Sequence, residues 1–205
     1  MAIKPILFNS DMVRAILDGR KTVTRRVVKP QPENNCDLII AESFGKLELQ
    51  YNGGVYAFPY QKGDILYVRE TWKENNIVAE GKYLYKADFG DLIYDKPYSN
   101  WKWKPSIHMP KEAARIFLRV TNVSVARLQD CGNGWCIEIE KEGIKTPQDP
   151  ILYANDENFH KALREEMRRV WNSTIKKQDL DRYGWDANPR VWVIEFERTE
   201  KPKDF

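Results

Sequence analysis

Two stretches in which apolar residues recur at every second position constrain the fold of this chain most strongly. In residues 115–128, Ile116, Leu118 and Val120 form such a series, and a slip at Asn122 indicates a β-bulge. A period of two is typical of a strand with one buried face. The sequence therefore predicts a sheet whose long strands cover a core.

The second stretch, residues 190–199, predicts a closing strand with Trp192, Ile194 and Phe196 on one face. Short strands and a few helices, without regular strand–helix–strand alternation, predict an α+β fold built on a small, mostly antiparallel barrel or sheet. The residues expected to share one barrel core are Val68, Ile116, Leu118, Val120, Val193 and Ile194.

Three helices are predicted from apolar spacing and from end signals. The first lies within residues 9–19, where Asn9, Ser10 or Asp11 can cap the start and Gly19 suits the end. Residues 157–173 give the strongest helical pattern. Residues 137–143 form a shorter candidate that ends at a glycine.

The rest of the chain predicts elaborations on a single domain that spans residues 1–205. The insertion at about 30–60 has a turn signal and weak alternation, so we expect a hairpin-like excursion there. The insertion at about 73–110 is polar and aromatic, and we expect a long loop with short strands. Residues 200–205 form a short polar tail that we expect to be frayed.

Composition excludes several classes of protein. A hydrophobic share of 42% excludes wholesale disorder. The formal net charge is only +3, so a site for a polyanion has to be a local patch. No apolar window is long enough for a membrane span, and the N-terminus does not resemble a signal peptide. Three cysteines fit reduced thiols in a cytosol, so we expect a cytoplasmic protein. We also expect it to be a monomer.

Metal and cofactor motifs are missing from the sequence. The two histidines, His108 and His160, are far apart, and Cys131 and Cys136 lack the spacing of a zinc knuckle. No phosphate-binding loop or dinucleotide fingerprint occurs. We therefore expect neither a metal nor an organic cofactor.

The segment from Gly19 to Arg26 is the first candidate site. On an extended strand Thr24 and Arg26 share a face, and Lys21 lies in the preceding turn. A desolvated lysine beside a threonine hydroxyl is a plausible base and nucleophile, and Arg25 or Arg26 can hold a phosphate or a carbonyl oxygen. The alternative is a solvated basic turn that complements a helix C-terminus.

Carboxylates and tryptophans supply further candidates. Glu70 is predicted to face inward from a strand and needs a partner, and the alternative is an ion pair with an arginine at the strand edge. The acidic stretch that ends at Glu142 is either functional or a solvated helix face. Trp103, in a run of tryptophans and lysines, can stack a base or cover a small core.

Six blocks of sequence, in order from about residue 3 to residue 198, together resemble the ASCH domain family, most closely its larger members from phages and prophages. The second block contains the pattern Gly19-x-Lys21-Thr22-x-Thr24-Arg25-Arg26. The blocks are Pro5-Ile6-Leu7-Phe8, Met12 to Arg26, Gly63 to Trp72, Trp103 to Pro110, Glu142-Gly143-Ile144 and Val191 to Phe196.

The resemblance implies a PUA-like fold, a small twisted β-barrel with flanking helices and a cleft, which in relatives binds RNA or modified nucleobases. Small bacterial members include amidohydrolases that remove the acetyl group from N4-acetylcytidine. Their working lysine, threonine and glutamate match Lys21, Thr24 and Glu142, and the motif arginine matches Arg26. The two insertions depart from these short enzymes and leave the substrate open.

The resemblance thus favours a metal-independent hydrolase that acts on an N-acyl amide of a modified cytosine nucleoside. Thr24 would attack the acyl carbon, Lys21 would take its proton, and Glu142 would protonate the leaving nitrogen or orient Lys21. The alternatives are a non-catalytic module that binds RNA or a modified base, and a ribonuclease. The residues expected to bind the substrate are Arg26, Glu70, Arg25, Trp103 and Trp72.

Overall fold

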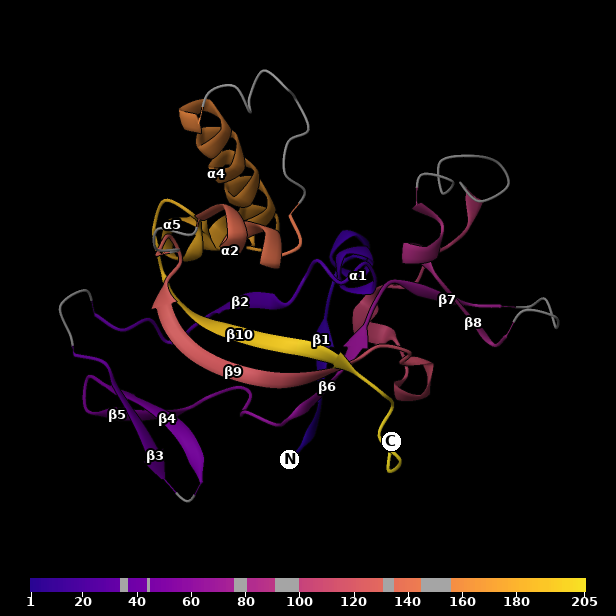
Figure 1. The fold of residues 1–205 in the computed structure, drawn as a ribbon, viewed down its shortest axis with the longest axis horizontal. Coiled ribbons are helices and arrows are strands. Elements are labelled where there is room, and N and C mark those ends of the chain that lie inside the picture. The colour runs from indigo at the N-terminus through magenta and orange to yellow at the C-terminus, as the bar shows by residue number, and fades with distance from the viewer. Residues whose placement is uncertain (34–36, 44, 76–80, 91–99, 131–134, 145–155) are drawn as a thin grey trace.

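A five-stranded sheet forms the centre of the protein in a computed structural model (Figure 1). The structure describes residues 1–33, 37–43, 45–75, 81–90, 100–130, 135–144 and 156–205. The sheet has the order β1-β6-β9-β10-β2; β1 and β6 are parallel and the other neighbours antiparallel. Its strands are β1 (Ile3–Leu7), β6 (Ile65–Arg69), β9 (Phe117–Arg127), β10 (Arg190–Thr199) and β2 (Val23–Val27).

The predicted α+β class is confirmed, but strand pairing does not close this sheet into a barrel. Its edge strands, β1 and β2, have no ladder between them in the part of the chain that the structure describes. Each edge strand is only five residues long, whereas β9 and β10 are about twice that length and curve together across the molecule (Figure 1).

The predicted bulge lies in the β9–β10 ladder. Glu195 is opposite Asn122, but the next residue of β10, Phe196, is opposite Val120. Thr121 is therefore the extra residue on β9. This confirms the slip predicted beside Asn122, where the alternation of buried residues changes phase.

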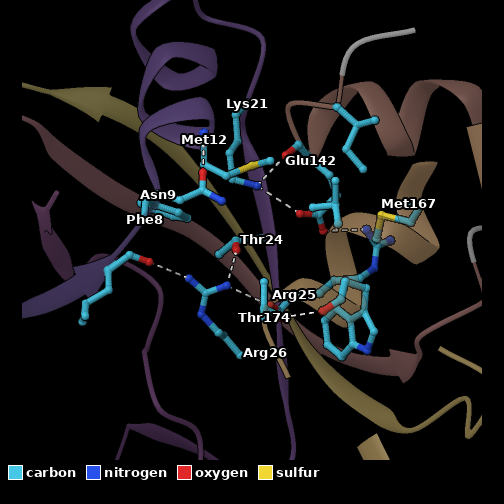
Figure 2. A pocket seen from close by; sticks show the side chains of 14 residues that line it. Phe8, Asn9, Met12, Lys21, Thr24, Arg25, Arg26, Glu142, Met167 and Thr174 are labelled. Atoms are coloured by element: carbon cyan, nitrogen blue, oxygen red, sulfur yellow. Dashed lines mark hydrogen bonds and ion pairs between the residues drawn. The ribbon is translucent and has the colours of Figure 1, made fainter. Parts of the chain in front are cut away.

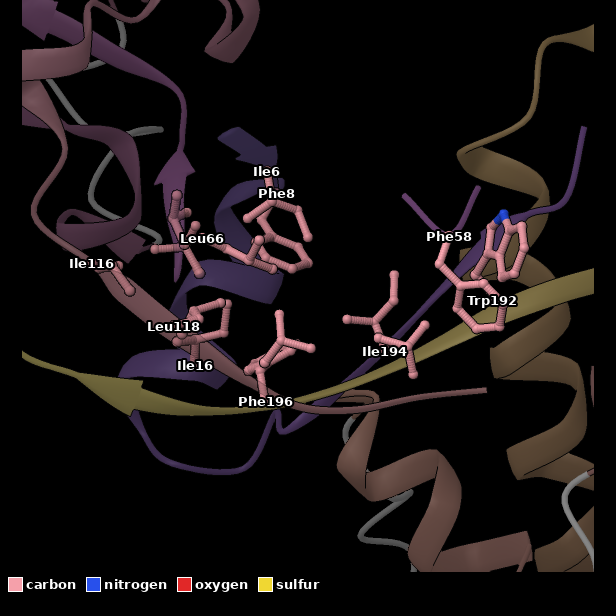
Figure 3. Packing of buried hydrophobic residues seen from close by; sticks show 14 of the residues in the cluster. Ile6, Phe8, Ile16, Phe58, Leu66, Ile116, Leu118, Trp192, Ile194 and Phe196 are labelled. Carbon is pink, nitrogen blue, oxygen red and sulfur yellow. The ribbon is translucent and has the colours of Figure 1, made fainter. Parts of the chain in front are cut away.

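The main core lies on one face of the sheet (Figure 3). It contains the predicted set Trp192, Ile194 and Phe196 together with Val68 and the alternating residues of β9. Val193 was wrongly assigned to this core. It packs in a second cluster on the opposite face, since neighbouring residues of a strand point to opposite sides.

Helices cover the second face. α4 (Asp156–Ser173) packs Leu163, Met167 and Trp171 against Val191 and Val193 of β10. In Figure 1, α2 (Trp135–Lys141) and α5 (Leu180–Tyr183) lie beside α4, while α1 (Ser10–Leu17) follows β1. No helix among the described residues combines the length and apolar character that a membrane crossing requires.

The first insertion forms a small sheet of its own, with the order β3 (Ile39–Ser43), β4 (Lys46–Tyr51) and β5 (Gly54–Ala57). This is one strand more than the predicted hairpin. Leu49, Tyr51 and Phe58 join the main core, which attaches this sheet to the rest of the protein.

The second insertion contains the short antiparallel strand pair β7 (Trp72–Glu74) and β8 (Tyr83–Tyr85). This agrees with the prediction of a loop that contains short strands. Among the described residues, the 3₁₀ turns η1 (Lys86–Asp88), η4 (Ser106–His108) and η5 (Lys111–Ala113) follow the pair, and η7 (Lys177–Asp179) precedes α5. The strands β7 and β8 lie at the end of the sheet near β1 and β6 (Figure 1).

The prediction of a frayed tail is wrong. The ring of Phe205 packs edge-on against Phe117 and Tyr67, with centroids 4.7 and 5.2 Å away, and belongs to a third apolar cluster. The polar composition of residues 200–204 concealed this single aromatic anchor.

Leu118 offers a test of the main core. Its side chain is fully buried, so we expect Leu118→Ala to lower the free energy of unfolding by about 2–5 kcal/mol. Val55→Ala, at a side chain that is 60% exposed, should change it by less than about 0.5 kcal/mol. Urea denaturation measures both, and equal effects would contradict the described core.

Candidate functional site

The C-terminal end of α2 is joined to the turn that precedes β2. The backbone N–H of Thr22 donates to the carbonyl of Lys141 at 2.9 Å, and the Arg20 guanidinium donates to the carbonyl of Gly143 at 3.2 Å. Gly143 has φ +82°, and a Cβ there would lie 2.7 Å from Ala15 Cβ and 2.9 Å from Lys21 Cβ. Only glycine therefore lets the backbone beside Glu142 approach this closely.

The Glu142 carboxylate lies between two cations. Oε2 accepts from Lys21 Nζ at 3.0 Å, and Oε1 accepts from the Arg25 guanidinium at 2.7 Å. The exposed fractions of Lys21, Arg25 and Glu142 are 3%, 5% and 7%. Lys21 and Glu142 therefore lie together, as predicted. Their burial excludes a solvated basic turn at Lys21 and a solvated helix face at Glu142.

Lys21 is fully occupied in this arrangement. Besides Oε2 of Glu142, its ammonium donates to the backbone carbonyl of Glu142 at 2.7 Å and to that of Val23 at 2.6 Å. Three acceptors match the three N–H bonds of a charged lysine. Burial acts in the opposite direction and lowers the pKa of Lys21, while the Glu142 carboxylate opposes this effect.

Thr24 and Arg26 share one face of β2, as predicted. The Arg26 guanidinium donates to Thr24 Oγ1 at 2.8 Å, and its other amino group donates to the carbonyl of Leu7 at 3.0 Å. Arg26 thus links the two edge strands of the sheet. The predicted hydrogen bond between Lys21 and Thr24 is not formed, because Lys21 gives its three donors to Glu142 and Val23.

These side chains surround a pocket of about 550 Å³, counting its opening to solvent (Figure 2). A second hollow, of about 870 Å³, adjoins it and shares four lining residues: Asn9, Met12, Ile144 and Val170. The pocket is lined by Leu7, Phe8, Asn9, Met12, Lys21, Thr24, Arg25, Arg26, Glu142, Ile144, Met167, Val170, Trp171 and Thr174.

Glu70 is not among the residues that line this pocket. It is buried, as its place on the strand predicted, and both carboxylate oxygens accept from Arg115, at 2.9 and 3.1 Å. Burial raises the pKa of Glu70, and Arg115 opposes the increase. Glu70, which was expected to bind the substrate, thus follows the ion-pair alternative, and Arg115 also binds Asp88 in η1.

Trp72 and Trp103 are likewise absent from the pocket lining. Trp72 is buried in the third apolar cluster and packs edge-on against Tyr83. Trp103 contacts Phe89 and Trp101, with ring centroids 5.7 Å apart in both pairs. Trp72 is thus part of a core and Trp103 is part of a half-buried aromatic group, and neither contributes to the pocket lining.

Residues that the sequence did not single out complete the pocket wall. Phe8 lies beneath two cations, with Lys21 Nζ 5.6 Å and the Arg26 guanidinium 5.3 Å from the ring centroid. Met167 and Trp171 come from α4. Phe8 stands in the first block of the resemblance, whereas nothing distinguishes the α4 residues from an ordinary apolar stripe.

No cluster of three or more metal-ligating side chains occurs in the described ranges. Cys36 and Cys131, which bear on the metal prediction, lie outside those ranges. Comparisons of the chain with models of protein families, with curated proteins and with solved structures gave no match.

The lowered pKa of Lys21 predicts a pH dependence of stability. Between the lowered pKa and the ordinary value of 10.5, Lys21 binds more protons in the unfolded chain than in the folded one. The contribution of Lys21 to the free energy of unfolding therefore increases as pH rises through this range. We expect the free energy of unfolding of Lys21→Met, relative to the original protein, to fall progressively as pH rises towards 10.5.

Chemical denaturation at a series of alkaline pH values measures this difference. Lys29→Met, at an exposed lysine, is the control and should show no such trend. A difference that stays constant or changes in the opposite direction would show that folding does not lower the pKa of Lys21.

Proposed function

We propose that this chain is a PUA-like, ASCH-type hydrolase that cleaves an N-acyl amide on a cytosine-type nucleoside. The proposal rests on one observation: Lys21, Thr24 and Glu142 line a single pocket although Glu142 is 121 residues from Lys21. The resemblance gives catalytic roles to these three residues. Arg26, the motif arginine, contacts Thr24 directly.

The proposed reaction adds water across an amide bond. Thr24 Oγ attacks the acyl carbon while its proton passes to Lys21, and a tetrahedral intermediate forms. The C–N bond breaks as the exocyclic nitrogen takes a proton, so the amine leaves and an ester remains on Thr24. Water then hydrolyses this ester to release the carboxylic acid and restore the hydroxyl.

Lys21 must lose a proton before it can act as a base. Its 3.0 Å hydrogen bond to Glu142 provides a direct acceptor, and a proton that moves there leaves a neutral amine beside a carboxylic acid. Burial favours loss of the proton from Lys21 because it penalises the charged amine. Glu142 would then carry the proton that the leaving nitrogen needs.

Arg26 supplies positive charge at the nucleophile. Its guanidinium is fixed at the Leu7 carbonyl and donates to Thr24 Oγ1, which places N–H groups next to the atom that attacks. Such preorganised donors stabilise an oxyanion as it develops. The proposed role of Arg26 is therefore electrostatic stabilisation of the tetrahedral intermediate.

Thr24→Val tests the nucleophile because it keeps the shape of the side chain and removes the hydroxyl. We expect conversion of N4-acetylcytidine to cytidine and acetate, followed by mass spectrometry, to slow by about 10²-fold or more. Thr24→Ser, which retains the hydroxyl, is the matched control and should keep measurable turnover. Turnover by Thr24→Val at the original rate would refute the role of Thr24.

The saturation of Lys21 by three acceptors favours one alternative, a pocket that binds a modified base without turning it over. The salt dependence of binding shows whether the ligand is a free nucleoside or RNA. Binding of N4-acetylcytidine should change little with ionic strength, whereas binding through phosphates weakens linearly on a log–log plot. Titrations of the nucleoside and of a short acetylated RNA at several salt concentrations measure this. Tighter binding of the RNA than of the nucleoside, with a steep slope for the RNA alone, would favour the RNA-binding module.

A further inference from the structure

The side-chain amide of Asn9 is held in one orientation at the N-terminus of α1. Asn9 Oδ1 accepts the backbone N–H of Met12 at 2.9 Å, as an N-cap residue does. This contact assigns the carbonyl end of the side chain to the helix. Figure 2 shows the amide nitrogen on the opposite side, directed towards the space between Lys21 and Thr24.

The charged groups around this space are committed to one another. Lys21 uses three N–H bonds, and each oxygen of the Glu142 carboxylate is bound by a cation. In contrast, the Asn9 amide nitrogen has no acceptor within the described part of the chain. Asn9 therefore directs its two N–H donors towards a ligand, while its Oδ1 faces the backbone of α1.

Apolar walls flank Asn9 in the pocket. Phe8, Met12, Ile144 and Trp171 contribute apolar surface to the same pocket. A polar group that is fixed beside apolar walls discriminates between ligands by the hydrogen bond that it demands. A ligand that presents a donor at this point would leave two donors facing each other.

We propose that Asn9 is a specificity-determining residue that selects a pyrimidine whose ring edge carries acceptors, and so favours a cytosine-type base over a uracil-type base. Cytosine presents the N3 and O2 acceptors side by side, whereas uracil carries a hydrogen on N3. The proposal rests on the proposed function for the kind of ring that is bound. It does not depend on whether the amide is cleaved.

Two substitutions at Asn9 separate recognition from the helix cap. Asp and Ser are both good N-cap residues, so Asn9→Asp and Asn9→Ser should keep the free energy of unfolding within about 0.5 kcal/mol of the original. Asn9→Asp replaces the two donors by a charged acceptor. Asn9→Ser removes the amide without adding charge, and it controls for the effect of a new carboxylate beside Lys21.

The experiment is a calorimetric or NMR titration of each protein with cytidine and with uridine. We expect the original protein to bind cytidine more tightly than uridine. Asn9→Asp should weaken the binding of cytidine by about tenfold or more. The preference for cytidine over uridine should reverse or vanish in Asn9→Asp, and the ratio of the two affinities should decrease in Asn9→Ser. An unchanged preference in Asn9→Asp, or no binding of either nucleoside by the original protein, would overturn the inference.

Failure of this inference and failure of the proposed function give different results. If cytidine binds with the expected preference but N4-acetylcytidine is not hydrolysed, the assignment of Asn9 stands and the hydrolase proposal fails. If N4-acetylcytidine is hydrolysed but Asn9→Asp leaves both nucleosides unaffected, the hydrolase proposal stands and Asn9 has only its capping role.

Discussion

The Glu142 carboxylate, held between Lys21 and Arg25, is the interaction on which the rest of the site depends. It fixes the C-terminal end of α2 against the edge strand β2, and this contact forms one wall of the pocket. Loss of one partner of a buried ion pair leaves an uncompensated charge, which typically destabilises a protein by about 3–5 kcal/mol. Here one carboxylate serves two buried cations, and of these Arg25 also lies 3.7 Å from Oε2 of Glu138, so removal of Glu142 would affect Lys21 most.

The pocket lies where the sheet is left open by its strand order. β1 and β2 are edges with no ladder between them among the described residues, and side chains fill the space that a barrel would close. Arg26 crosses it from β2 to the Leu7 carbonyl, and the Phe8 ring lies beneath the guanidinium. The open edges therefore position a threonine hydroxyl, a cation and an aromatic face within one cavity.

Local patterns predicted the elements well because each depends on neighbouring residues. The alternation gave β10 as residues 190–199, and the phase change at Asn122 gave the bulge. The capping residue at Asn9 gave the start of α1. Each of these signals is contained in a short window, so no long-range contact was needed to read it.

The partners of the buried charges were beyond the reach of such patterns. Alternation showed that Glu70 is inward, yet its partner is Arg115, 45 residues away and beside several other candidate arginines. Two of the three acceptors of Lys21 are backbone carbonyls, which any residue type supplies. The predicted contact between Lys21 and Thr24 is absent because backbone carbonyls accept the lysine N–H bonds instead. No sequence pattern indicates which backbone carbonyls will bind a lysine.

Stability does not account for this charged cluster. Buried ion pairs often contribute no more than apolar residues of the same volume would, because the desolvation of each charge offsets their attraction. The surroundings of Lys21 and Glu142 include Ile144 and Met167, so an apolar replacement would meet a suitable environment. What an apolar residue cannot supply is an amine whose pKa burial lowers, joined by a hydrogen bond to a carboxylate. Perturbed groups of this kind concentrate at functional sites. The cluster therefore marks this pocket as the candidate functional site of the chain.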